Sequence, residues 1–323
     1  MSPELSDVIE RRFKVSGGAI LSVENPAGET HVHGAAGDEV VVRARKRAYS
    51  ESTEGGKRVL ENLEVQMEQV GNKISIWQRA YMLERGWMNL FRERRATVDY
   101  VIDVPRGSQV NVRSASGEIE VRGVEGALEL QSVSGDVAVD DVRGALRLKT
   151  VSGDIAATRC AGSTDVNTVS GDLVFRSCSW PSCHVRAISG DINAEALMNG
   201  RIDVNTISGD VQLATPSPFT LNFDTTSGDL HANGVSVEKV SRRSYVAQFG
   251  RGGADISVHT VSGDLAVQHA DVDAPEAPAT APVVAEAPSA MDRKAEALEI
   301  LKALESGSID AEEAARRLDR ARG

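Results

Sequence analysis

Residues 146–154 read Leu-Arg-Leu-Lys-Thr-Val-Ser-Gly-Asp, and variants of this pattern return along much of the chain. Its closing tripeptide, Ser-Gly-Asp or Ser-Gly-Glu, recurs at intervals of 18, 18, 18, 19, 19, 19 and 35 residues. A nearly constant period is typical of repeat proteins, in which each unit buries its apolar face against its neighbours. The expected structural turn ladder comprises Gly117, Gly135, Asp136, Gly153, Asp154, Gly171, Asp172, Gly190, Asp191, Gly209, Asp210, Gly228, Asp229, Gly263 and Asp264.

Apolar residues keep fixed positions relative to each glycine, seven, five and two residues before it and two and four after it. Alternation on both sides of a glycine turn predicts two short, half-buried strands per unit. Because every unit returns to the same position, neighbouring strands are expected to be parallel and ~4.8 Å apart. The sequence therefore predicts an all-β fold, a parallel β-solenoid (β-helix) of 18–19-residue coils over residues 106–268. The 35-residue interval contains either a degenerate unit or an insertion.

Residues 1–105 are expected to form an N-terminal β region and a cap of the solenoid. The same spacing around Gly28 predicts an early coil that is separated in sequence from the others. Further strands are predicted at residues 40–44, 63–67, 74–77 and 98–104, and a short helix at residues 52–60.

The C-terminal part differs in composition from the repeats. Residues 269–290 are rich in Pro and Ala and predict a disordered linker. Residues 291–323 show helical spacing of leucines, a glycine stop at Gly307 and a capping-box-like restart at Asp310. We expect a helical hairpin there that serves as a docking or self-association module.

The net charge of −11 argues against nucleic-acid binding, which needs a basic surface. The first residues lack a basic and apolar leader, and no apolar run is long enough for a membrane helix, so a cytoplasmic location is expected. Surface association is the alternative. Three cysteines do not make a disulfide framework, and Cys160, Cys178 and Cys183 are expected to be free thiols in an apolar column.

The Thr-Val-Ser-Gly-Asp ladder, together with the entry segment 98–105, resembles the bacterial "putative adhesin" family of β-strand-repeat proteins over residues 15–268. Residues 300–314 resemble the short helical-hairpin module called SHOCT-like. LiaX-type proteins of envelope-stress systems combine such parts. The resemblance implies a β-repeat fold and an envelope-stress or surface role.

The aspartates of the turn ladder raise the question of calcium. Calcium takes six to eight oxygen ligands, and one Asp per coil offers too few. We expect each Asp to accept a backbone N–H within its own turn. The Thr or Ser column three residues before each glycine is expected to face away from the core. No motif for a metal or a cofactor is present, and none is predicted.

The segment 79–95 departs from the chemistry of the rest, with five Arg and two Glu interleaved with aromatic and aliphatic residues. It is either a cap over the open end of the solenoid or a surface for a protein partner or an anionic membrane. The candidate contact residues are Tyr81, Trp87, Phe91, Arg92, Arg94 and Arg95.

These observations bear on three classes of function. A non-enzymatic solenoid scaffold is favoured, and an adhesin-like or envelope-stress-associated surface protein is the alternative. A solenoid enzyme that cleaves polysaccharides would need a charged cluster in one groove. The outward positions considered for such a cluster are Gln131, Lys149, Asn167, Arg186, Asn205 and Asp224, and they form none.

Overall fold

The computed structural model describes residues 4–49, 53–80, 96–233, 235–251 and 253–270. The chain divides into two units, Met1–Pro278 and Ala279–Gly323. All described residues belong to the first unit, so the linker and the helical hairpin expected in residues 269–323 lie almost wholly outside them.

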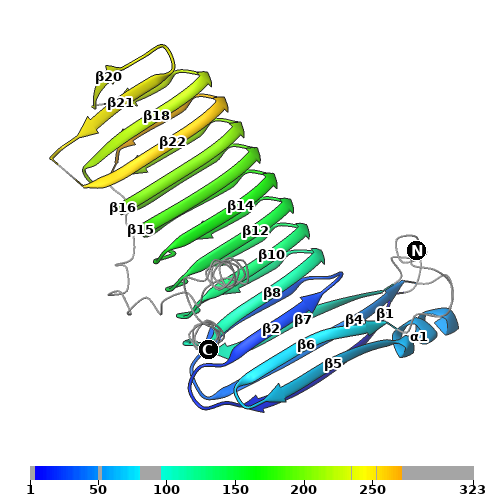
Figure 1. The fold of residues 1–323 in the computed structure, drawn as a ribbon. Coiled ribbons are helices and arrows are strands. Elements are labelled where there is room, and N and C mark those ends of the chain that lie inside the picture. Colours follow the sequence, from blue (N-terminus) through cyan, green and yellow to red (C-terminus); the bar gives the residue numbers. More distant parts are fainter. Residues whose placement is uncertain (1–3, 50–52, 81–95, 234, 252, 271–323) are drawn as a thin grey trace, which may run out of the picture. The chain divides into compact units, whose positions relative to one another are not determined.

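The described unit is a stack of β-coils, each with two long sides joined by the Ser-Gly-Asp turn (Figure 1). We call the strands that end at this turn the first side and those that follow it the second side. The first side contains β2 (Ile20–Asn25), β8 (Gln109–Ser116), β10 (Leu128–Ser134), β12 (Leu146–Ser152), β14 (Thr164–Ser170), β18 (Phe219–Ser227), β22 (Ala254–Ser262) and the later halves of β15 (Leu173–Ser189) and β16 (Ile192–Ser208). The second side contains β3 (Thr30–Ala35), β9 (Ile119–Arg122), β11 (Val137–Asp140), β13 (Ile155–Thr158), β17 (Val211–Thr215), β19 (Leu230–Asn233), β23 (Leu265–His269) and the earlier halves of β15 and β16.

Neighbouring coils pair in parallel and in register on both sides, as the constant period predicts. Isolated parallel bridges, Arg143↔Ala161 and Ala161↔Ser179, also link neighbouring coils where the chain passes from the second side of one coil to the first side of the next. Mostly parallel β-structure in stacked coils is therefore confirmed.

The order of the coils in space differs from their order in sequence at both ends of the stack. On the first side, β2 pairs with β6 (Lys73–Ala80) along one edge and with β8 along the other. On the second side, β3 pairs in the same way with β7 (Ala96–Pro105) and with β9. At the other end of the stack, β22 pairs with β16 along one edge and with β18 along the other. In the same way, β23 pairs with β17 and with β19. The first and last coils of the sequence are thus each held between two others.

The 35-residue interval contains an insertion. Strands β20 (Ser236–Lys239) and β21 (Ser244–Phe249) form an antiparallel hairpin whose second strand pairs with β18. The opposite end is covered by antiparallel pairing of β1 (Glu4–Lys14) with β4 (Glu39–Tyr49), of β4 with β7, and of β5 (Leu63–Val70) with β6. Helix α1 (Thr53–Asn62) packs against β1, β4 and β5. These elements cap that end, whereas the cap expected from segment 79–95 falls on residues 81–95, which lie outside the described residues.

Alternation along the first side shows that the expectation for the Thr and Ser column is wrong, and that the neighbouring aliphatic column faces solvent. The Thr and Ser side chains three residues before each glycine are buried, with exposures of 4% for Ser132 and 5% for Thr150 and Thr168. The aliphatic side chains two residues before each glycine are exposed instead, for example Val133 at 54%. In a strand, residues at −7, −5 and −3 share one face, so the residue at −2 must point to the other. The core is therefore lined by the Thr and Ser column, and the Val and Ile column meets solvent.

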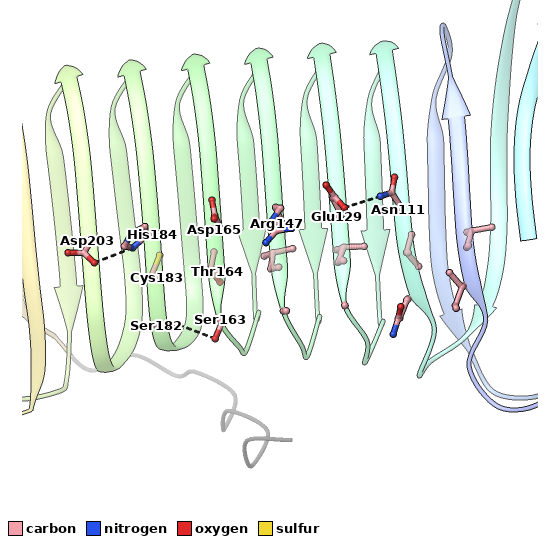
Figure 2. Close-up of a pocket in the computed structure, with 18 of the residues that line it drawn as sticks. Asn111, Glu129, Arg147, Ser163, Thr164, Asp165, Ser182, Cys183, His184 and Asp203 are labelled. Atoms are coloured by element: carbon pink, nitrogen blue, oxygen red, sulfur yellow. Dashed lines mark hydrogen bonds and ion pairs between the residues drawn. The ribbon is translucent and has the colours of Figure 1, made fainter. Parts of the chain in front are cut away.

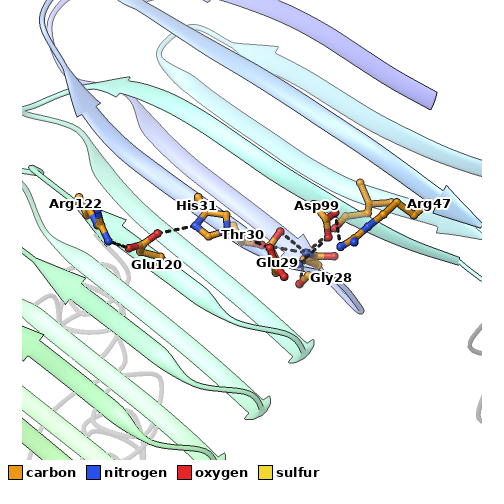
Figure 3. Close-up of polar contacts among 10 residues, drawn as sticks. Gly28, Glu29, Thr30, His31, Arg47, Asp99, Glu120 and Arg122 are labelled. Atoms are coloured by element: carbon orange, nitrogen blue, oxygen red, sulfur yellow. Dashed lines mark hydrogen bonds and ion pairs between the residues drawn. The ribbon is translucent and has the colours of Figure 1, made fainter. Parts of the chain in front are cut away.

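Polar side chains hold the early coil in its place between β7 and β9 (Figure 3). The backbone N–H of Glu29 donates to Asp99 Oδ1 on β7 at 3.1 Å, and Asp99 also pairs with Arg47. On the other edge, His31 Nδ1 lies 2.7 Å from Glu120 Oε2 on β9, and Nε2 lies 3.4 Å from Glu29. The inserted coil is thus tied to both neighbours by side chains as well as by backbone pairing.

The His31–Glu120 contact predicts a pH dependence of stability. Burial alone would lower the pKa of His31, but hydrogen bonds to Glu120 and Glu29 outweigh it and raise this pKa. A raised histidine pKa stabilises the fold fully below the unfolded value of about 6.5, and this contribution is lost as pH rises through the folded value. His31→Ala should therefore lower Tm more at pH 6 than at pH 9 in calorimetric scans. The control is His231→Ala, at an exposed imidazole, and an equal loss at both pH values for His31→Ala would contradict the prediction.

Candidate functional site

A groove of about 650 Å³ crosses the outer face of the first side (Figure 2). It is hollow because the residue eight positions before each ladder glycine is small in four successive coils. In the same column, Arg201 stands at one end of the groove, and Gln109 followed by Ile20 stands at the other. The small residues along the floor are Ala127, Ala145, Ser163 and Ser182.

One wall of the groove is a column of polar side chains, one from each coil, six residues before the ladder glycine. Strand register places them directly beside one another. In spatial order they are Asn111, Glu129, Arg147, Asp165, His184 and Asp203. Charge alternates along most of this wall, which brings each acidic group within one strand spacing of a cationic or amide group.

The acidic groups of the wall already have partners. Glu129 accepts hydrogen bonds from Asn111 Nδ2 at 3.0 Å and from Gln131 Nε2 at 2.8 Å. Asp165 Oδ1 accepts one from Asn167 Nδ2 at 2.6 Å. The carboxylates on either side of position 147 are therefore engaged by neutral amides.

Asp203 closes the wall at its far end and is almost fully buried. Its Oδ2 lies 2.9 Å from Arg201 Nε and 3.2 Å from His184 Nδ1. On the floor nearby, Ser182 Oγ donates to Ser163 Oγ at 3.0 Å. This end of the groove is consequently a satisfied polar network.

Arg147 is the exception in the wall. It is exposed and has no hydrogen-bond or ion-pair partner among the described residues. Its guanidinium carries N–H donors in a planar fork that matches a carboxylate or phosphate. The groove therefore offers one available cation between two carboxylates that are already hydrogen-bonded.

The turn ladder is built differently from the expectation for its aspartates. Every ladder glycine has a positive φ, as a turn of this kind requires. Six of the seven aspartates, however, accept the backbone N–H of the corresponding Asp in the next coil, at 2.8–2.9 Å, and not one in their own turn. Asp229, the last in space, donates its own N–H to Asp264. The reason is stacking, because the next coil places its N–H one strand spacing above the carboxylate. These contacts follow the spatial order Asp136, Asp154, Asp172, Asp191, Asp210, Asp264 and Asp229.

The other sequence-predicted residues contribute no site in the described part of the chain. Tyr81, Trp87, Phe91, Arg92, Arg94 and Arg95 all lie outside it. The described residues contain no group of three or more His, Cys, Asp or Glu that could hold a metal ion.

The three cysteines are buried free thiols. The hydrogen bond with Cys178 and burial both raise the pKa of Cys160, and burial raises the pKa of Cys183. Nucleophilic cysteines require a lowered pKa and access to solvent. Cys160 and Cys183 therefore act as small core residues.

The sequence analysis did not predict the groove, because the column four residues before each glycine, which includes Lys149, forms no charged cluster. The signal lay two and four positions further upstream, where small residues at −8 accompany large polar residues at −6. A small residue beside a large one on one face predicts a hollow, and this pattern was available in the sequence.

No helix in the described ranges is both long and apolar enough to cross a membrane.

The stacked coils define a β-solenoid, and a groove lined by polar side chains crosses one of its sides. The chain belongs to the family described as toastrack DUF4097, whose model matches residues 35–268. Comparison with the curated proteins found no match.

Solved structures similar to this chain come from several bacteria. A "putative adhesin" from Bacteroides fragilis is 10% identical, with a TM-score of 0.47, and the match covers 81% of this chain and 97% of that one. A "putative lipid binding protein" from Parabacteroides distasonis is 12% identical, with a TM-score of 0.38, covering 82% and 97%. A "putative cell adhesion protein" from Clostridium sporogenes is 11% identical, with a TM-score of 0.26, covering 82% and 100%. These names describe those proteins.

Proposed function

We propose that this protein is a non-enzymatic β-solenoid scaffold whose groove binds an extended, carboxylate-bearing oligosaccharide. The observation that carries the proposal is the unpaired guanidinium of Arg147 in the middle of the groove wall. The amides that engage Glu129 and Asp165 leave this cation available to a ligand.

The shape of the groove favours an extended ligand. The floor crosses five strand spacings from Gln109 to Arg201, about 24 Å at ~4.8 Å per strand. A ligand lying along the stack meets one polar side chain at each coil. This periodic arrangement suits a chain of repeating units better than a compact molecule.

The chemistry of the wall favours sugar units over a polyanion. Hydroxyl groups can donate to Glu129 and Asp165 and accept from the neighbouring amides. A carboxylate at every unit would meet these two acidic groups and be repelled, whereas a single carboxylate at Arg147 is attracted. We therefore infer a ligand in which acidic sugars alternate with neutral ones.

Arg147→Gln should weaken binding of a hyaluronan tetrasaccharide, which alternates acidic and neutral sugars, by about ten- to a hundredfold. This corresponds to about 1.5–3 kcal/mol for a hydrogen bond to a charged group. Titration calorimetry measures the effect. The matched control is Lys149→Gln, which removes an exposed cation on the same strand and face but outside the groove lining. Equal affinity of Arg147→Gln and wild type, or no binding by wild type, would refute the proposed ligand.

The remaining parts of the scaffold proposal concern residues that, apart from Arg79 and Ala80, lie outside the described ranges. Residues 291–323 would supply the docking or self-association module, and segment 79–95 a contact with a protein partner or an anionic membrane. The alternative is an adhesin-like or envelope-stress-associated surface protein, in place of a cytoplasmic one. Cell fractionation separates these two locations, and the groove could serve in either.

A further inference from the structure

A row of exposed aliphatic side chains runs along the first side beside the Ser-Gly-Asp turns. Each belongs to a different coil, and the six coils are consecutive in space. Their exposures lie between 43% and 54%. We call this row the aliphatic ridge; it consists of Val133, Val151, Val169, Ile188, Ile207 and Val261.

The coils do not need the ridge for their own packing. The residues at −7, −5 and −3 already fill the core from this strand, for example Leu146, Leu148 and Thr150. The ridge extends over five strand spacings, about 24 Å at ~4.8 Å each. Single exposed aliphatic residues are normal on a protein surface, but a contiguous row marks a contact surface.

The two flanks of the ridge carry opposite chemistry. Beyond the turn lies the ladder of aspartates, whose side chains are exposed. On the other flank, two residues before the ridge on the same face, Lys149 and Arg186 contribute exposed cations among neutral side chains. Lys149 has no partner among the described residues, and Arg186 makes only a 3.4 Å hydrogen bond to Asn167.

Such a surface is complementary to itself in one orientation. A two-fold axis parallel to the ridge sets each coil against the same coil of a second copy, so that the Asp ladder faces the column of Lys149 and Arg186. A two-fold axis across the ridge instead sets Asp ladder against Asp ladder, which like charges disfavour. Isologous contacts need this kind of self-complementarity.

We propose that the aliphatic ridge is the interface for a second copy of this chain, packed about a two-fold axis parallel to the ridge. The apolar row supplies the buried core of the interface, and the two charged flanks supply its rim. The charges set the orientation, because they match only when the two ridges run parallel.

The test is sedimentation velocity on the full-length chain at micromolar concentration. Val151→Lys with Ile188→Lys places two cations in the ridge near the Asp ladder, where they are compatible with the fold, and should weaken self-association at least about tenfold. The matched control is Val70→Lys with Val237→Lys, two exposed valines elsewhere in the described unit, with exposures of 77% and 45%. Circular dichroism checks that both variants are folded. A monomeric wild type, or association unchanged in the ridge variant, would overturn the proposal.

The orientation has its own test. With the axis parallel to the ridge, Val133→Cys and Val261→Cys, at the two ends of the ridge, should each form a disulfide-linked dimer with itself on mild oxidation. With the axis across the ridge, neither would link to itself and only a mixture of the two would link. The second pattern, or capture of a different protein in place of a second copy, would overturn the assignment of the partner.

Discussion

A chain that ends at Gly253 is expected to lose the far end of the coil stack, whereas one that ends at Ala270 is expected to keep it. Residues 254–269 form a coil that is inserted between two others. One neighbouring coil contributes β16 and β17, and the other contributes β18 and β19. Without this coil, β18 keeps only its antiparallel partner β21. Its removal also takes the buried side chains of Ile256, Val258 and Leu265 out of the core.

Hydrogen exchange measures this effect region by region. In the shorter chain, amides of residues 219–249 should lose protection, while those of residues 109–170 should keep it. The chain that ends at Ala270 is the control for truncation as such. It also tests the C-terminal module, because this shorter chain should stay folded but change its association state or its partners. Retained protection at residues 219–249 in the shorter chain would show that the inserted coil is dispensable.

Gly171→Ala is expected to destabilise the protein by roughly 2–4 kcal/mol, because alanine there would have a left-handed backbone conformation and its Cβ would clash with a neighbouring coil. Gly171 has a φ of +128°, and a Cβ there would lie 2.2 Å from the carbonyl oxygen of Gly153 in the preceding coil. Neither problem can relax locally, because the carbonyl belongs to a turn held in the same ladder.

Urea denaturation, followed by circular dichroism, measures the free energy of unfolding. Gly107→Ala is the matched control, because a Cβ there meets nothing within 4 Å and its φ is not in the left-handed range. It should change stability by less than about 0.5 kcal/mol. A similarly small effect at Gly171 would mean that the turn ladder is not required for the stack.

Local pattern accounts for the elements that the sequence predicted correctly. The strands around Gly28 and at residues 40–44, 63–67, 74–77 and 98–104 are all present, and so is the helix near residues 52–60. Each of these depends on alternation or turn residues within a few positions, and nearby partners do not alter them. The burial of the −3 column and the exposure of the −2 column also follow from this alternation, because residues at −7, −5 and −3 lie on one face of the strand.

The groove depended on an arrangement that only the folded stack reveals. The small residue of one coil and that of the next are 18 or 19 positions apart, and they form a floor only when the coils are stacked in register. The availability of Arg147 depends in turn on the hydrogen bonds of its two acidic neighbours. Glu129 accepts one from an amide in the next coil, and Asp165 accepts one from an amide two residues further along its own strand. Residue types predict a charged column, but hydrogen-bond geometry decides which charge is free.

The sequence by itself determined the repeating unit, because an 18–19-residue period with glycine at one position and apolar residues at alternate ones permits parallel stacking and little else. Tertiary structure decided the order of the coils. All coils share nearly the same apolar positions, so the pattern does not distinguish one neighbour from another. The choice is made by contacts specific to each end, such as His31 with Glu120 and the pairing of β21 with β18. Those contacts join residues far apart in the chain, and they place the first and last coils inside the stack.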